Sequence, residues 1–143
     1  MNRFVVDSSV AVCWCLGDET NPYADAILRA LRTHTARAPS LWPFEGANGL
    51  LMGERQGRLT IAESQRALAD LAALPIDVEL ATAERATREV MELARSEGLT
   101  VYDAAYLELA MREGLPLATL DTQLKAAATR VGVTEFDPSG GPA

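Results

Sequence analysis

Histidine, cysteine and lysine are nearly missing from this chain. His34 is the single histidine, Cys13 and Cys15 are the two cysteines, and Lys125 is the only lysine. A single histidine excludes histidine-rich zinc sites and any mechanism that uses two histidines as acid and base. The two cysteines lie one residue apart on a predicted helix, so their side chains point to different faces and favour reduced thiols over a disulfide. We expect His34 to lie on the surface.

Long apolar runs are also missing. No stretch approaches the roughly 18 to 20 apolar residues of a membrane-spanning helix, and the first residues lack the apolar core and cleavage site of a secretory signal. We therefore expect a cytoplasmic protein with no membrane partner. Apolar residues make up 48% of the 143 residues, without a low-complexity block. This composition predicts one globular domain over residues 1–136 and a disordered, Pro/Gly-rich tail over 137–143.

Basic residues are outnumbered by acidic ones. The chain has 13 basic and 20 acidic residues, and its formal net charge is −7. Such a balance argues against nucleic-acid binding, which usually depends on a basic surface. Divalent cations held by clustered acids would reverse the sign of the local charge, so the net charge alone does not decide the class of ligand.

Short apolar runs alternate along the chain with longer helical patterns. We expect strands at residues 3–6, 36–42, 75–80, 115–121 and 133–136, and helices at 9–16, 21–32, 43–55, 60–73, 82–97, 102–113 and 122–131. This alternation is typical of an α/β fold with a mostly parallel sheet flanked by helices. Gly46, Gly49 and Gly53 weaken the prediction of the helix 43–55, whereas Thr60 and Glu63 predict a capping box.

Four acids occupy one kind of position, at the end of a predicted strand or the start of a predicted helix. They are Asp7 after the first strand, Glu45 just after Pro43, Asp103 three residues after Thr100, and Asp121 at the end of "PLATLD". Each one alone is explained equally well by helix capping or by the helix dipole.

Taken together, the four acids indicate a binding site. The carboxyl ends of parallel strands and the helix starts that follow them lie along one edge of a sheet, where ligands bind. Four carboxylates there would repel one another and raise some pKa values unless cations bind. Oxygen ligands without a usable His or Cys favour Mg²⁺ or Mn²⁺ over zinc. We therefore predict a site for a hard metal ion, with capping as the alternative role of each acid.

Polar and aromatic neighbours have two interpretations each. Ser8 or Ser9 offers a hydroxyl to the site or to phosphate, or caps the following helix. Thr119 either faces the site beside the last acid or is simply a good strand former. Asn48, one turn after Glu45, either orients that acid or belongs to the polar surface. Tyr102 is interpreted as a packing or interface residue rather than a catalytic one. The apolar surface of the helices 21–32 and 43–55, with Trp42, Phe44, Leu50, Leu51 and Met52, is interpreted mostly as core, with a dimer or partner contact as the alternative.

The segments "VVDSS", "PFEGAN", "LTVYDAAYLELA" and "LATLDTQL" carry the four acids in order. With these segments the chain resembles the PIN-domain family, most of all the VapC-type toxins of bacterial toxin–antitoxin pairs, over about residues 3–136. The resemblance implies a three-layer α/β/α fold and a Mg²⁺- or Mn²⁺-dependent endoribonuclease. It places catalytic and metal-binding roles on Asp7, Glu45, Asp103 and Asp121, and hydroxyl positions on Ser9 and Thr119.

The resemblance also implies partners: an RNA substrate, a second copy of the chain in a homodimer, and a cognate VapB-type antitoxin that inhibits the toxin by placing a basic side chain in the acidic site. Because no histidine pair is present to activate a ribose 2′-OH, we expect a metal-activated water to cleave the RNA and leave a 5′-phosphate and a 3′-OH. The Gly-rich helix after Glu45 departs from the family pattern.

Three alternatives stay open. A catalytically silent PIN-like binding module would use the acids only to cap helices or to receive a basic partner. A receiver-like phosphoacceptor domain also combines acids, Mg²⁺ and a Thr at a sheet edge. Such a domain needs paired acids after the first strand and a Lys at the end of a late strand. In this chain the only lysine, Lys125, lies in a predicted helix. A DNA-directed nuclease of the wider superfamily would differ in substrate.

Overall fold

Four short parallel strands form the centre of the structure. The computed structural model describes residues 2–17 and 20–140. The strands are β1 (Arg3–Val6), β2 (Thr35–Ala38), β3 (Ile76–Val78) and β4 (Leu117–Ala118), in the spatial order β3-β2-β1-β4. Every neighbouring pair in this sheet runs parallel. The predicted α/β class with a parallel central sheet is therefore confirmed.

All seven predicted helices are present. They are α1 (Ser8–Cys15), α2 (Pro22–Ala30), α3 (Trp42–Arg55), α4 (Ile61–Ala73), α7 (Val101–Glu113), α8 (Thr122–Arg130), and a stretch made of α5 (Thr82–Arg85), the π-helical turn η1 (Ala86–Val90) and α6 (Met91–Glu97). The last three together cover the helix predicted at 82–97. The capping box at the start of α4 is formed as predicted by Thr60 and Glu63.

The predicted last strand, 133–136, is wrong. Only an isolated parallel bridge joins Leu117 to Glu135, and β4 itself is limited to two residues of the predicted strand 115–121. The chain turns away because Phe136 stacks on Phe4, with ring centroids 4.0 Å apart. In addition, the Tyr23 hydroxyl donates a hydrogen bond to the Phe136 carbonyl at 2.7 Å. Two backbone hydrogen bonds with Leu117, one donated by the Phe136 amide and one accepted by the Thr134 carbonyl, both 2.9 Å, are the only ladder bonds that the described structure gives this segment.

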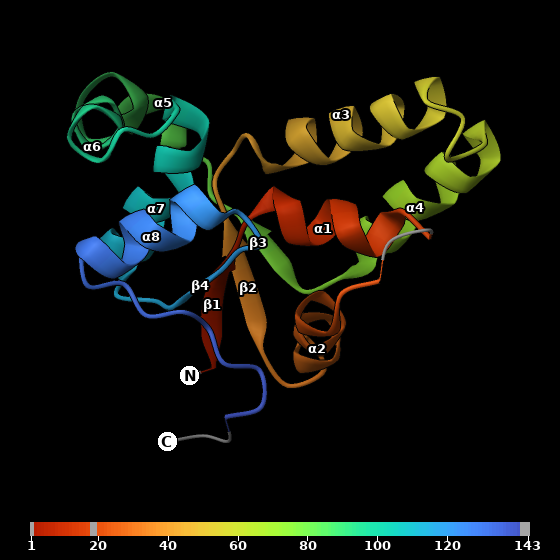
Figure 1. The fold of residues 1–143 in the computed structure, drawn as a ribbon, viewed down its shortest axis with the longest axis horizontal. Coiled ribbons are helices and arrows are strands. Elements are labelled where there is room, and N and C mark those ends of the chain that lie inside the picture. Colours follow the sequence, from red (N-terminus) through yellow and green to blue (C-terminus); the bar gives the residue numbers. More distant parts are fainter. Residues whose placement is uncertain (1, 18–19, 141–143) are drawn as a thin grey trace.

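The helices cover the sheet in two groups (Figure 1). α1 packs against α2, α3 and α4, and this group lies on the right of the strands in the view. α7 packs against β1, β4, α6 and α8 on the left. The apolar strand between the two groups is fully covered, since Phe4, Val5 and Val6 are each 0% exposed. β1 is thus the central strand of the core.

Gly49 has a packing role that outweighs its weak helix propensity. A Cβ atom built on Gly49 would lie 2.6 Å from Cγ2 of Val12 in α1. The missing side chain therefore allows α3 to approach α1 closely, and the helix forms in spite of its glycines. This close contact fixes where α3 begins relative to the end of β1.

The scarce residue types occupy defined places. Neither cysteine forms a disulfide, and Cys13 is buried while Cys15 is partly buried, as predicted. His34 is not a surface residue: it is partly buried, and its ring lies edge-on to Phe4 and to Phe136, at centroid distances of 6.2 and 5.3 Å. It precedes the first residue of β2, where the aromatic cluster closes the amino end of the sheet.

The start of the predicted tail forms a turn. Oδ1 of Asp137 accepts hydrogen bonds from the amide and the hydroxyl of Ser139, at 2.9 and 2.7 Å. Residues 141–143 of the predicted tail lie outside the described residues. Within the described ranges, no helix combines the length and apolar character that crossing a bilayer requires.

A partly buried ion network ties β3 to the helices of the second group. Arg112 donates to both oxygens of Glu79, at 2.6 and 2.7 Å, and its Nε donates to Glu108 at 2.9 Å. Arg85 donates to the same oxygen of Glu108 at 2.8 Å. The two carboxylates are well enclosed, with exposed fractions of 9% for Glu79 and 8% for Glu108. Arg112 therefore compensates two acids that have little access to water.

Arg112→Met is expected to lower the free energy of unfolding by about 2 kcal/mol, because Glu79 and Glu108 each lose a charged partner while Glu108 keeps Arg85. The matched control is Lys125→Met, which breaks the pair with Glu135, whose side chains are 52% and 47% exposed. This control should change stability by less than about 0.5 kcal/mol. Urea unfolding followed by circular dichroism measures both variants, and equal losses would contradict the role assigned to Arg112.

Candidate functional site

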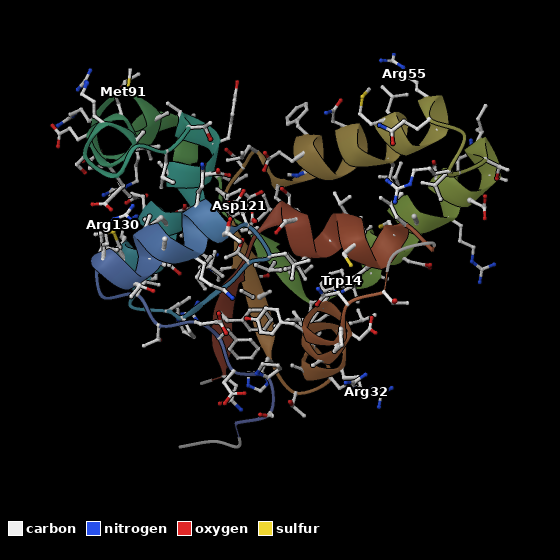
Figure 2. The ribbon with its side chains drawn as sticks, viewed as in Figure 1. Trp14, Arg32, Arg55, Met91, Asp121 and Arg130 are labelled. Carbon is white, nitrogen blue, oxygen red and sulfur yellow. The ribbon has the colours of Figure 1, made fainter. Side chains whose placement is uncertain are left out.

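The register of β1 and β4 brings polar side chains together at one edge of the sheet. Val6 pairs with Ala118, so the next residues, Asp7 and Thr119, meet just beyond the two strand ends. β2 lies on one side of β1 and β4 on the other, and ligands of open α/β sheets bind at such a switch point. α1, α3 and α8 begin near this end of the strands (Figure 1), and Asp121 is seen there at the start of α8 (Figure 2).

Asp7 is buried and is held by two hydroxyl groups. The side chains of Ser9 and Thr119 each donate a hydrogen bond to its Oδ2, both at 2.7 Å. Asp7 is 3% exposed and Thr119 is 2% exposed. Although Asp7 stands at the N-cap position of α1, the described structure gives its side chain no capping hydrogen bond. The hydroxyls of Ser9 and Thr119 orient Asp7. Hydrogen bonds from the backbone amides of Ser8 and Ser9 join them in opposing the rise that burial causes in the pKa of Asp7.

The same hydroxyls connect the ends of β1 and β4. The amide of Leu120 donates to Oγ of Ser9, and the amide of Asp121 donates to Oγ1 of Thr119, both at 3.0 Å. Asp121 itself caps α8, since its Oδ1 accepts a hydrogen bond from the amide of Leu124 at 2.9 Å. For Asp121 the capping interpretation is correct, and its second oxygen takes no part in this cap.

Glu45 lies in the first turn of α3 and is half-buried. Its Oε1 accepts a hydrogen bond from the phenol of Tyr106 at 2.6 Å. Tyr106 lies in α7 and is 0% exposed. The sequence interpretation missed Tyr106, although a signal was present: Tyr106 follows Asp103 by three residues on a predicted helix, so both side chains lie on the same face.

Asp103 lies in the first turn of α7, where its amide donates to Oγ1 of Thr100 at 3.1 Å. Burial and the negative charges of Asp7, Asp121 and Glu45 raise the pKa of Asp103 to about 6. The carboxyl group of Asp103 is therefore close enough to the three other acids to interact with their charges. Two of those acids, Asp7 and Asp121, are more than a hundred positions apart in the sequence.

Uncompensated charge distinguishes this group of acids from the rest of the protein. In the described part of the chain, none of the four forms an ion pair, whereas Glu79, Glu108 and Glu113 each have an arginine. Burial raises the pKa of Asp7, and its hydrogen bonds from Ser9 and Thr119 oppose that rise. Burial also raises the pKa of Glu45, and the charge of Asp7 adds to the effect. The arginines labelled in Figure 2 lie at the periphery, away from Asp121.

The donor set suits a hard divalent cation. Every candidate ligand is a carboxylate or hydroxyl oxygen, which is the chemistry that Mg²⁺ and Mn²⁺ prefer, and a bound cation would relieve the mutual repulsion. Among the described residues, no three His, Cys, Asp or Glu side chains are arranged as a ready-made metal site. The residues fit such an ion by chemistry and charge.

Other predicted neighbours lie on the surface. Asn48 is exposed, and among the described residues it makes no hydrogen bond to the four acids. Phe44 is 78% exposed, so the packing interpretation is wrong for it. Tyr102 is 64% exposed, so of its two interpretations, packing or interface, packing does not hold within the chain. Trp42 and Leu50, by contrast, are 7% and 3% exposed, so for these two the packing interpretation is confirmed.

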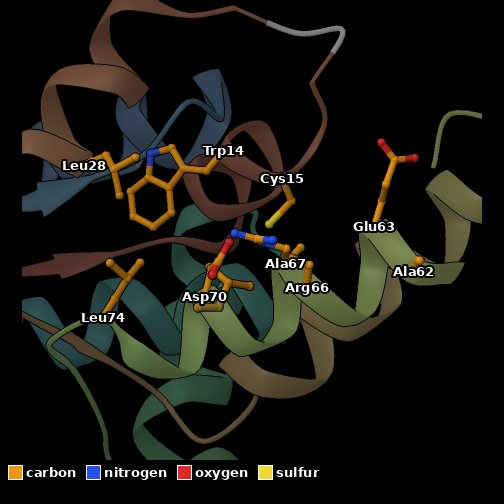
Figure 3. Close-up of a pocket in the computed structure, with 10 residues that line it drawn as sticks. Trp14, Cys15, Leu28, Ala62, Glu63, Arg66, Ala67, Asp70 and Leu74 are labelled. Atoms are coloured by element: carbon orange, nitrogen blue, oxygen red, sulfur yellow. The ribbon is translucent and has the colours of Figure 1, made fainter. Parts of the chain in front are cut away.

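A groove elsewhere on the molecule is chemically different from this site. It lies between α1, α2 and α4, has a volume of about 510 Å³, and is lined largely by apolar side chains. Figure 3 shows Trp14, Leu28 and Leu74 around it, with Arg66 and Asp70 near its middle. None of the four clustered acids contributes to the lining, so the groove does not belong to the candidate site.

Comparisons with known proteins agree with this fold. The family model described as "PIN domain" matches residues 4–129. A curated relative, ribonuclease VapC3 of Pyrobaculum aerophilum, is 32% identical over 123 residues, which cover 85% of this chain and 92% of the relative. The region matched by the family model contains all four acids.

Two solved structures are similar over nearly the whole chain. The crystal structure of PAE2754 from Pyrobaculum aerophilum has a TM-score of 0.67 at 25% identity and covers 94% of this chain and 83% of that one. FitAcB from Neisseria gonorrhoeae has a TM-score of 0.62 at 18% identity and covers 94% of this chain and 97% of that one. The second likeness concerns the fold alone.

Neutralising Asp103 should stabilise the metal-free protein at neutral pH. Because the pKa of Asp103 rises from 3.8 to about 6 on folding, the folded state binds this proton more tightly than the unfolded chain. The ionised group therefore destabilises the fold increasingly as the pH rises through this window. Asp103→Asn should raise the free energy of unfolding in EDTA at pH 7.5, and the gain should shrink as the pH falls towards 4.

The control for this measurement is Asp25→Asn, which removes an exposed acid from the first turn of α2. That change should lower stability by a few tenths of a kcal/mol, about 0.3, because a favourable helix-dipole interaction is lost. The proposed repulsion would be contradicted if Asp103→Asn lowered the free energy of unfolding by an amount that does not change with pH.

Proposed function

The chain belongs to the PIN domain family, and from this membership we propose that it is a Mg²⁺- or Mn²⁺-dependent endoribonuclease, the toxin of a VapBC-type toxin–antitoxin pair. The observation that carries the proposal is the group of Asp7, Glu45, Asp103 and Asp121, which interact electrostatically without a basic partner among the described residues. Similarity to a protein named ribonuclease VapC3 over most of the chain supports RNA as the substrate.

We propose that Asp7, Asp103 and Asp121 hold the cation, with Glu45 as a further ligand or as the group that orients water. When bound, the metal ion supplies a more acidic water and neutralises charge on the phosphate that is cleaved. Ser9 and Thr119 orient Asp7 by donating to Oδ2, which leaves Oδ1 for the cation. Asp121 keeps one oxygen on the amide of Leu124 and has the other for the site.

The position of the only histidine supports water as the nucleophile. His34 precedes β2 and contacts Phe4 and Phe136 at the amino end of the sheet, whereas the acids lie beyond the carboxyl ends of β1 and β4. A histidine at the opposite end of a strand cannot remove the proton of a ribose 2′-OH at the acidic site. The proposed products are therefore a 5′-phosphate and a 3′-hydroxyl.

Two protein partners belong to the proposal. A cognate antitoxin would place a basic side chain among the four acids, and both the net charge of −7 and the absence of ion pairs at these acids in the described residues favour such a segment. A homodimer is proposed from the family resemblance. The antitoxin and the divalent cation would compete for the same carboxylates, so inhibition would be electrostatic as well as steric.

Cleavage of single-stranded RNA in Mn²⁺ or Mg²⁺ tests the enzyme assignment. Asp7→Asn and Asp103→Asn should each reduce the cleavage rate by more than about 100-fold, since loss of a direct ligand costs at least as much as loss of the groups that support ligands. Asp25→Asn should cut like the wild type, and EDTA should abolish cleavage by all variants.

Equal cutting by the wild type and both site variants would exclude these acids as the catalytic group and favour a binding module. Single-stranded DNA of matched sequence is assayed in parallel. Faster cleavage of the DNA would replace RNA as the proposed substrate.

The ends left on the RNA test the nucleophile. We expect a 5′-phosphate, which blocks direct labelling by polynucleotide kinase until a phosphatase removes it, and a 3′-hydroxyl, which accepts a ligated adaptor without treatment. Mass spectrometry of the fragments gives the same information independently. Fragments ending in 2′,3′-cyclic phosphate would show that a ribose hydroxyl attacks the phosphate, and the proposed water mechanism would be wrong.

A further inference from the structure

A buried tyrosine beside the candidate site makes a contact that the proposed roles of the acids do not explain. Tyr106 is 0% exposed, and its hydroxyl donates to Oε1 of Glu45 at 2.6 Å. A donor–acceptor distance this short is typical of a hydrogen bond to a charged oxygen. The two residues are 61 positions apart in the sequence, so the contact joins the first turn of α3 to α7.

We propose that Tyr106 is a positioning residue of the acidic site, which holds Glu45 by Oε1 so that Oε2 faces the other three acids and the cation they bind. This inference rests on the proposed function, because it assumes that the four acids bind a metal ion. It assigns Tyr106 no contact with substrate or metal.

The argument starts from the freedom of the glutamate side chain. Glu45 has a longer side chain than the three aspartates, and it is only half-buried, so its carboxylate needs a fixed partner to keep one orientation. Asp7 has such partners in Ser9 and Thr119, and Asp121 has one in the amide of Leu124. Tyr106 is the corresponding buried partner of Glu45, and a weaker effect on the pKa of Glu45 comes from a hydrogen bond with Ser8. Groups that orient metal ligands in this way influence metal affinity by about 10- to 100-fold.

The geometry of α7 gives the contact a second consequence. Asp103 and Tyr106 are three residues apart on one helix, so their side chains emerge on the same face. One rigid helix therefore supplies an acid to the site and also holds the acid that comes from α3. The ring of Tyr106 is fully buried in the core, so the donor that holds Glu45 is itself fixed on the helix that carries Asp103.

A competing explanation is that Glu45 merely satisfies the hydroxyl of a buried tyrosine, since such hydroxyls usually find a partner. The two explanations predict different effects on stability and on metal affinity. If the bond only serves the tyrosine, its loss changes stability and leaves metal affinity unaltered. If it positions Glu45, its loss weakens metal binding while the ring keeps the core packed.

The test is the affinity of Tyr106→Phe for Mn²⁺, measured on the full chain by isothermal titration calorimetry and by electron paramagnetic resonance of free Mn²⁺. The expected result is a Kd raised by about 10- to 100-fold. Tyr23→Phe is the matched control, because Tyr23 is a partly buried tyrosine whose hydroxyl donates to the Phe136 carbonyl at 2.7 Å, away from the acids. Its Kd should stay within about twofold of the wild-type value.

The double variant Glu45→Gln with Tyr106→Phe identifies the route of the effect. If Tyr106 acts through Glu45, the double variant binds Mn²⁺ no more weakly than Glu45→Gln alone. Additive losses, an unchanged Kd for Tyr106→Phe, or equal losses for Tyr106→Phe and Tyr23→Phe would each overturn the proposal.

The wild-type protein separates this inference from the proposed function. A wild type that binds Mn²⁺ but cuts no RNA would refute the ribonuclease proposal, and the role of Tyr106 would still be judged from the Mn²⁺ affinities. A wild type that binds no Mn²⁺ would refute both.

Discussion

The parallel pairing of β1 with β4, on the side of β1 opposite to β2, is the constraint on which the site depends. It places Asp7 and Thr119 at the same level beyond two neighbouring strands, and the two hydroxyl bonds to Oδ2 of Asp7 follow from that register. Because all the strands are parallel, the helix starts that carry Glu45, Asp103 and Asp121 also face this edge of the sheet. One register thus assembles acids from four separate segments.

The acids of this protein fall into two groups that differ in their partners. Acids near Arg37, Arg85 and Arg112 are paired, and they stabilise the junction between β2, β3 and α7. The acids at the carboxyl edge have hydroxyl, phenol and amide donors instead, and burial together with the charges of the other three acids raises the pKa of Asp103 to about 6. Neutral donors orient a carboxylate without cancelling its charge. The arrangement costs stability without a cation and leaves the acids available for one.

Local patterns predicted most of the secondary structure, because it depends on neighbouring residues. The capping box of Thr60 and Glu63 marked the start of α4, and apolar periodicity located the other helices. The errors came where distant contacts override local preference. Phe136 stacks on Phe4 instead of extending a strand, the same ring covers His34, and Gly49 is kept by its contact with Val12. The hydrogen bond from Thr119 to Asp7 likewise depends on a distant contact.

The sequence by itself determined that four acids lie at the ends of strands or at the starts of helices, and that the fold is α/β. It also determined that no second histidine and no metal-binding thiol is present. Each of these properties is local or compositional. Only the tertiary structure decided which groups hold those acids. The bond from Thr119 to Asp7 spans 112 positions and the bond from Tyr106 to Glu45 spans 61. Such contacts depend on strand order and helix packing, which no window of the sequence contains. The acids and the hydroxyls of Ser9 and Thr119 were therefore predicted as candidates, whereas their pairing and the contact of Tyr106 were not.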